Sequence, residues 1–154
     1  ISGNGIPLDA YKVDYASGAV EEMVLKYKNS EYLIIEGQGS LLNPGSTATL
    51  PLMRGSCPTA LVLCHRLGLR VVESETKILI PPLEQVINLN EQLVTGLNSF
   101  PTAKVKAVSL DTRCYDHTSA INEISKMEDK LNLPVTDPVR FSAKKIANAL
   151  IYLN

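Results

Sequence analysis

Short apolar segments that alternate with longer stretches of helical periodicity constrain this chain more than any other feature. Two of them, residues 32–35 and 60–64, are unbroken apolar runs, and a third, residues 105–110, is mostly apolar. An unbroken run of this length is typical of a strand that is covered on both faces, as in a parallel sheet between layers of helices. The segments therefore predict three strands of one buried sheet.

Apolar residues at helical spacing predict four helices around these segments. The first spans residues 15–28. The second begins at residues 81–82, two prolines that are tolerated there because first-turn N–H groups have no helical acceptor. Thr118 or Ser119 can cap the third helix, and Ser142 can cap the last. Strands that alternate with such helices indicate βαβ units, so we predict an α/β fold with a parallel sheet flanked by helices.

Three shorter segments are less regular. A short helical stretch is expected near Leu52, and a short strand at the start of the loop 134–138. Residues 70–72 fit either an edge strand or a loop.

Composition limits the class of protein. The 154 residues carry a formal net charge of −1 and are 45% hydrophobic, which suits one domain with a proper core. No apolar run approaches the roughly 18 residues of a membrane span, and clustered Lys and Arg are missing, so we expect neither a membrane nor a nucleic-acid partner. Three cysteines without metal-ligand spacing indicate a reduced, cytoplasmic protein.

The start of the chain suggests that more sequence belongs to the domain. Ile1 leads directly into the glycine loop Gly3-Asn4-Gly5, and a loop of this type normally follows a strand. Three strands are also few for a parallel sheet. We therefore expect residues 1–154 to be the C-terminal part of a longer α/β domain.

Open parallel sheets bind ligands at the carboxyl ends of their strands. Three such ends can be predicted here, at Glu36, His65 and Asp111. The carboxyl ends of parallel strands meet at one edge of a sheet. Three polar residues at that edge indicate a site for a small-molecule substrate more strongly than one such residue would.

Glu36 directly follows the first apolar run and is flanked by Gly37 and Gly39, which keep the backbone around it open. A lone carboxylate is costly to bury, so Glu36 must reach solvent or find a partner. A carboxylate at a strand end beside phosphates usually holds Mg²⁺, and the alternative is a surface turn or an internal ion pair.

The other two strand ends carry polar groups of a different kind. His65 fits a general acid or base, an anion ligand or a hydrogen-bonded structural residue. Asp111 and Thr112 fit either ligand recognition or a turn cap. Arg140 and Asp137 lie together in the loop before the last helix, where an internal ion pair is the alternative to substrate binding.

The glycine loop near the N-terminus is a weaker candidate. Gly3 and Gly5, with Asp9 and Asp14 shortly after them, resemble a ligand-facing loop that leads into a helix. Two glycines are a weak signal by themselves, and Asp14 equally fits the N-cap of the following helix.

The order of these motifs is similar to that of a known family. The motifs are GNGIPLDAYKVDYASGAVEE, LIIEGQGSLLNP, LMRGSCPTALVLCH, AVSLDT and LPVTDPVRF. They resemble the C-terminal P-loop domain of a bacterial and archaeal family that was long labelled a domain of unknown function. Its characterised members are described as D-glutamate N-acetyltransferases. The resemblance covers residues 1–147 and implies a P-loop NTPase-like fold, distantly similar to dethiobiotin synthetase.

The resemblance also implies roles for individual residues. It assigns Glu36 to Mg²⁺ and the nucleotide phosphates, with Gly37, Gln38 and Gly39 around the cofactor. The family usually has Leu-Asn-Thr where this chain has Leu-Asp-Thr. In the related enzymes an asparagine near this place helps to recognise the nucleotide base, and Asp111 departs from that pattern. The lysine-containing phosphate loop and the N-terminal domain of the family do not occur in this sequence. We therefore expect no tight binding of ATP or acetyl-CoA, and no activity, from these residues alone.

The function implied by the resemblance is N-acetyl transfer to a D-amino acid such as D-glutamate. We also expect a homo-oligomer. In that enzyme Glu36 and Asp14 would organise a metal ion, His65 would assist proton transfer, and Arg140 would pair a substrate carboxylate. One alternative is an ATP-dependent amide-forming ligase like dethiobiotin synthetase. Another is a non-catalytic module that binds a nucleotide or metabolite.

Overall fold

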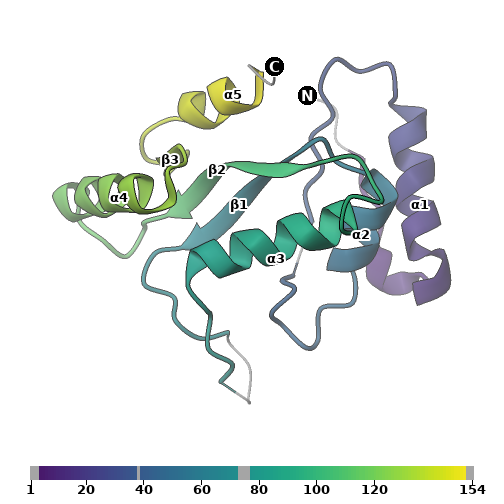
Figure 1. The fold of residues 1–154 in the computed structure, drawn as a ribbon, viewed down its shortest axis with the longest axis horizontal. Helices are drawn as coiled ribbons and strands as arrows, with labels where there is room; N and C mark the ends of the chain where they lie inside the picture. Colours follow the sequence, from purple (N-terminus) through teal and green to yellow (C-terminus); the bar gives the residue numbers. More distant parts are fainter. Residues whose placement is uncertain (1–3, 38, 73–76, 152–154) are drawn as a thin grey trace.

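The computed structural model describes residues 4–37, 39–72 and 77–151 (Figure 1). A three-stranded parallel sheet in the order β1-β2-β3 lies at its centre. The strands are β1 (Ala60–Arg66), β2 (Lys104–Asp111) and β3 (Val135–Thr136). The helices are η1 (Leu8–Ala10), α1 (Val13–Lys26), α2 (Thr49–Ser56), α3 (Leu83–Thr95), α4 (His117–Leu131) and α5 (Lys144–Ile151). The α/β fold with a parallel sheet and flanking helices is confirmed.

The central strand β2 is parallel to both of its neighbours, so all three strands end at the same edge of the sheet. Its pairing with β1 runs from Ala60 opposite Lys104 to Arg66 opposite Asp111, with one irregularity between Leu61 and Val62. The predicted convergence of the second and third strand ends is therefore confirmed.

The core lies between β2, β3 and α4. Its buried side chains are Val108, Leu110, Ile124 and Val135, and half-buried residues such as Met127 pack against them. Val108, Leu110 and Val135 have no exposed surface. The strand β1 is only half-buried because it has a partner on one side alone in the described part of the structure.

The helices α1 and α2 pack on each other at the end of the molecule away from α4 and α5 (Figure 1). Gly55 of α2 makes this close approach possible, since a Cβ atom there would lie 2.2 Å from the carbonyl oxygen of Ser17. No helix in the described ranges is long and apolar enough to cross a membrane.

The prediction of a buried strand at residues 32–35 is wrong. The segment has no regular secondary structure and pairs with no strand among the described residues, and Ile34 is 89% exposed. An apolar run fits the surface of a buried strand, but a strand forms only where another backbone supplies the hydrogen bonds. The run alone does not reveal whether that partner is present.

The predicted helix starts need one correction. Asp116, not Thr118 or Ser119, caps α4, because its carboxylate accepts a hydrogen bond from the Ser119 backbone N–H at 2.9 Å. The expected hydroxyl of Ser142 does accept the N–H of Lys144, at 3.1 Å, at the start of α5.

The less regular segments are also now defined. The helical stretch near Leu52 is α2, and the short strand after residue 134 is β3. Residues 70–72 form no regular strand, although Val71 makes a single antiparallel bridge to Leu79.

Shortening a core side chain should destabilise the domain far more than shortening an exposed one. We expect Leu110→Ala to lower the free energy of unfolding by about 3 kcal/mol, because the substitution leaves a cavity between the sheet and α4. The matched control is Leu25→Ala, at a side chain that is 57% exposed on α1. Urea denaturation of both variants measures the difference, and equal losses would contradict this location of the core.

Candidate functional site

A hollow of about 570 Å³ lies at the carboxyl edge of the sheet. The last three residues of β1 and of β2 line it, together with Arg113 and the loop 137–140 that follows β3. It thus brings together three chain segments that are distant in the sequence. This is the position at which open parallel sheets bind ligands.

Asp111, the last residue of β2, is held by two arginines. Both of its oxygens accept from Nε of Arg113, at 2.9 and 2.8 Å, and Nε of Arg66 lies 3.4 Å from Oδ2. The hydrogen bonds from Arg113 hold the pKa of the Asp111 carboxyl below its ordinary value. Asp111 is therefore an anion whose partners lie within the chain.

Asp137, directly after β3, is 3% exposed and lies under the hollow. One of its oxygens accepts from the N–H and the hydroxyl of Thr112, at 2.9 and 2.6 Å. The other accepts from the N–H groups of Val139 and Arg140, at 3.0 and 3.1 Å. Burial raises the pKa of this carboxyl, but the hydrogen bonds from Thr112 and the backbone outweigh burial and keep the pKa low. All of its hydrogen-bond donors are uncharged.

The Arg140 guanidinium is fixed by uncharged acceptors. Its Nη1 donates to the carbonyl and hydroxyl oxygens of Thr112, at 3.0 and 3.2 Å, and to the Tyr115 carbonyl at 2.8 Å. No carboxylate pairs with this side chain in the described part of the chain. Arg140 thus presents a positioned positive charge at the wall of the hollow, and the alternative of an Arg140–Asp137 side-chain pair is not observed.

The charges around the hollow favour an anionic ligand. Its described charged groups are three arginines and two aspartates, which leaves one positive charge in excess. His65 adds no charge at neutral pH, because burial lowers its pKa below the ordinary value of 6.5. The edge therefore combines a neutral proton acceptor with guanidinium groups that suit carboxylate or phosphate oxygens.

Three of the residues expected from sequence meet at this hollow: His65, Asp111 and Arg140. Thr112 lies immediately beside it but has no exposed surface, and its N–H and hydroxyl hold Asp137. In this structure Thr112 positions other groups and has no surface of its own for a ligand.

Glu36 and its loop do not line this hollow. Glu36 is exposed, and a Cβ atom at Gly37 would lie 2.2 Å from a methyl carbon of Leu52. Gly39 has a φ of +92° and sits against the Ser46 hydroxyl. The chain's own side chains thus fill the space beside both glycines, and the positive φ of Gly39 favours glycine there without a ligand.

The remaining candidates are dispersed. Asp14 is exposed in the first turn of α1 and makes no capping hydrogen bond, and Gly5 is exposed with open space around it. Gly3 and Gln38 lie outside the described residues, as does the side chain of Asp9. Within the described ranges no three Asp, Glu, His or Cys side chains are arranged to hold a metal ion.

Two functional candidates were missed from the sequence, Arg66 and Arg113. Arg66 directly follows His65 at a strand end, and Arg113 is two residues beyond Asp111. A cationic residue at each of two adjacent strand ends is a signal for an anion site that sequence alone could have provided.

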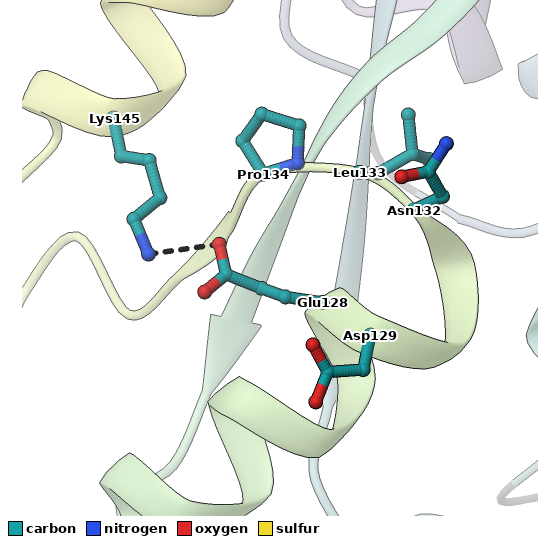
Figure 2. A pocket seen from close by; sticks show the side chains of 6 residues that line it. All are labelled: Glu128, Asp129, Asn132, Leu133, Pro134 and Lys145. Atoms are coloured by element: carbon teal, nitrogen blue, oxygen red, sulfur yellow. Dashed lines mark hydrogen bonds and ion pairs between the residues drawn. The ribbon is translucent and has the colours of Figure 1, made fainter.

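A second hollow, of about 590 Å³, opens beside the amino end of β3 and is structural (Figure 2). Glu128 accepts from Nζ of Lys145 at 2.8 Å and from the Val135 N–H at 2.9 Å. Lys145 also donates to the Val135 carbonyl at 3.1 Å, and Figure 2 shows the two charged side chains pointing toward one another. These polar groups tie α4 and α5 to β3.

Removing the charge of Asp137 should destabilise the protein. We expect Asp137→Asn to lower the free energy of unfolding by about 2 kcal/mol, because an amide nitrogen would face N–H donors that now bind a carboxylate. Asp129→Asn, at an exposed position on α4, is the control and should change stability by less than about 0.5 kcal/mol. Chemical denaturation at neutral pH distinguishes them, and an unchanged Asp137→Asn variant would contradict this role.

His65 should make stability depend on pH. Since its pKa is lower in the folded state, the unfolded chain takes up a proton first, and stability should fall as the pH drops below about 6.5. The fall ends once the pH passes the folded-state pKa. His65→Gln should remove this part of the slope, whereas His117→Gln should retain it. Unfolding free energies measured between about pH 8 and pH 5 test this, and equal slopes for all three proteins would refute it.

Comparison with known proteins identifies the family. Residues 1–147 match the family described as a domain of unknown function, DUF1611, C-terminal P-loop domain. A crystal structure of a DUF1611 family protein from Anabaena variabilis ATCC 29413 is similar with a TM-score of 0.93 and 48% identity. The similarity covers 97% of this chain and 44% of that chain.

Two curated relatives carry the name D-glutamate N-acetyltransferase. The protein from Tritonibacter scottomollicae is 30% identical over 151 residues, which cover 97% of this chain and 45% of that protein. The protein from a Pseudoalteromonas species is 31% identical over 141 residues, which cover 91% and 42%. The chain spans less than half the length of these relatives. It belongs to the DUF1611 family, whose C-terminal P-loop domain its residues 1–147 match.

Proposed function

We propose that this chain contributes the amino-acid site of an enzyme that transfers an acetyl group to a D-amino acid such as D-glutamate. The observation that carries the proposal is the hollow at the carboxyl edge of the sheet, where the uncharged imidazole of His65 and the positioned guanidinium of Arg140 line one space. The name of the two curated relatives supports the same activity.

His65 is the proton acceptor in this proposal. An amino group attacks a carbonyl carbon only in its neutral form, and an amino acid carries a protonated amine at neutral pH. Because burial lowers the pKa of His65, the imidazole is uncharged at that pH and free to take the proton. His65 also lies at a strand end, where the backbone of β1 restricts its position.

Arg140 binds a carboxylate of the amino acid. Its Nη1 is occupied by the Thr112 and Tyr115 acceptors, so the guanidinium is held in one orientation before a ligand arrives. A guanidinium that is already oriented loses less conformational freedom on binding than a mobile one. Its charge has no carboxylate partner among the described residues and is available to the ligand.

The acetyl donor of such a reaction, acetyl-CoA, supplies an activated thioester. Glu36 and Asp14 are exposed and belong to no cluster of three Asp, Glu, His or Cys side chains in the described ranges, and the proposal gives neither of them a step. The described chain's own contribution is to bind the amino acid, orient it and remove its proton.

The complete gene product should release coenzyme A when it is given D-glutamate and acetyl-CoA. We expect His65→Gln to lower kcat by about 100-fold, because the amine loses its proton acceptor. Arg140→Gln should mainly raise KM for D-glutamate. His117→Gln replaces the only other histidine of the chain and should leave both constants unchanged.

Two results would overturn this function. One is a native kcat in the His65→Gln protein. The other is release of ADP from ATP that depends on the amino acid, with no acetylated product, which would indicate an amide-forming ligase instead.

A further inference from the structure

We propose that Arg66 is a specificity residue that binds a second carboxylate, so that the hollow selects dicarboxylic over monocarboxylic amino acids. In this arrangement Asp111 is an internal counter-ion that a ligand carboxylate displaces from Arg66. The inference rests on the proposed function, since it names the substrate class of the same site.

Arg66 and Arg140 lie on opposite sides of the end of β2. Arg66 is paired in register with Asp111 from the β1 side, whereas Arg140 is bonded to Thr112 from the β3 side. Neighbouring strands are about 4.8 Å apart, so the ends of β1 and β3, on either side of β2, are roughly 10 Å apart, a gap that two long arginine side chains can narrow. The two carboxylates of glutamate, separated by three carbon atoms, are about 5 Å apart. One dicarboxylate can therefore reach both arginines.

The two arginines that contact Asp111 differ in how closely they approach its carboxylate. Arg113 makes two short contacts to the carboxylate, at 2.8 and 2.9 Å. Arg66 approaches it only through Nε, at 3.4 Å, and its side chain is 47% exposed. A guanidinium has five N–H donors, so Arg66 retains most of its hydrogen-bonding capacity. An exposed pair of this length contributes little to stability and is easily exchanged for a ligand carboxylate.

The charge of the hollow favours the same ligand class. Its described groups carry one positive charge in excess. A dicarboxylic amino acid carries a net charge of −1 at neutral pH, whereas a monocarboxylic one is neutral overall. Complementary charge steers and discriminates ligands, so a dicarboxylate should bind more tightly for this reason as well.

Calorimetric titration of the complete gene product with glutarate and with butyrate tests the selection without acetyl donor. We expect glutarate to bind at least about 10-fold more tightly than butyrate, because it adds one charge-assisted contact. Arg66→Gln should weaken glutarate binding by about 10-fold and leave butyrate unchanged, whereas Arg140→Gln should weaken both. Arg70→Gln, an exposed arginine outside the hollow, is the matched control and should change neither.

Asp111→Asn tests the counter-ion. If the carboxylate competes with the ligand for Arg66, removing its charge should tighten glutarate binding several-fold. Weaker binding in this variant would mean that Asp111 positions Arg66, and would overturn its role as a displaced group.

The outcomes separate this inference from the proposed function. Equal binding of glutarate and butyrate, or glutarate binding that is insensitive to Arg66→Gln, would overturn the selection even if D-glutamate is acetylated. Competition of coenzyme A with glutarate at the same arginines would also overturn it, since the anion site would then serve the donor's phosphates. Intact selection without any acetylation would overturn the proposed function alone.

Discussion

The arrangement of the carboxyl edge depends on the buried carboxylate of Asp137. It accepts hydrogen bonds from Thr112, at the end of β2, and from the backbone of Val139 and Arg140, after β3. The same Thr112 accepts a hydrogen bond from the Arg140 guanidinium. This one buried carboxylate thus fixes the exit of one strand and the loop after the next strand, and through Thr112 it helps to orient the Arg140 guanidinium. Networks of this kind are rigid because each missing partner would leave a buried polar group unsatisfied.

The surface above this network differs from it in exposure and in charge. Asp137 is bound by uncharged donors and is closed to solvent, whereas Asp111 is partly exposed and bound by two guanidinium groups. The buried layer therefore provides rigidity, and the exposed layer provides charges that a ligand can reach. His65 lies between these extremes, half-buried and uncharged at neutral pH. The proposed site, which would bind an anion and accept a proton from an amine, needs both a fixed frame and reachable groups.

Sequence reasoning predicted the strands that begin near residues 60 and 105, the helices α1, α3, α4 and α5, and the meeting of the strand ends His65 and Asp111 at one edge. Glu36 was expected at the same edge but does not line the hollow. It failed at residues 32–35, where an apolar run without a strand partner in the described structure remains exposed. It also missed Arg66 and Arg113, although each lies at or just beyond a predicted strand end. The pair of Arg66 with Asp111 joins two strands and leaves no periodic signal. The N-cap of α4 was predicted two or three residues too late, at Thr118 or Ser119, because these residues and Asp116 all have side chains that can cap a helix.

The sequence by itself determined the type and order of most elements, because helical and strand periodicity depend on residues close together in the chain. It also determined that a parallel sheet would gather polar residues at its carboxyl edge. Only the tertiary structure decided which of those residues touch. Thr112 and Asp137 are 25 positions apart, and Arg140 and Thr112 are 28 apart. Their contacts arise from the register of β2 with β3 and from burial, and neither is encoded in a local pattern.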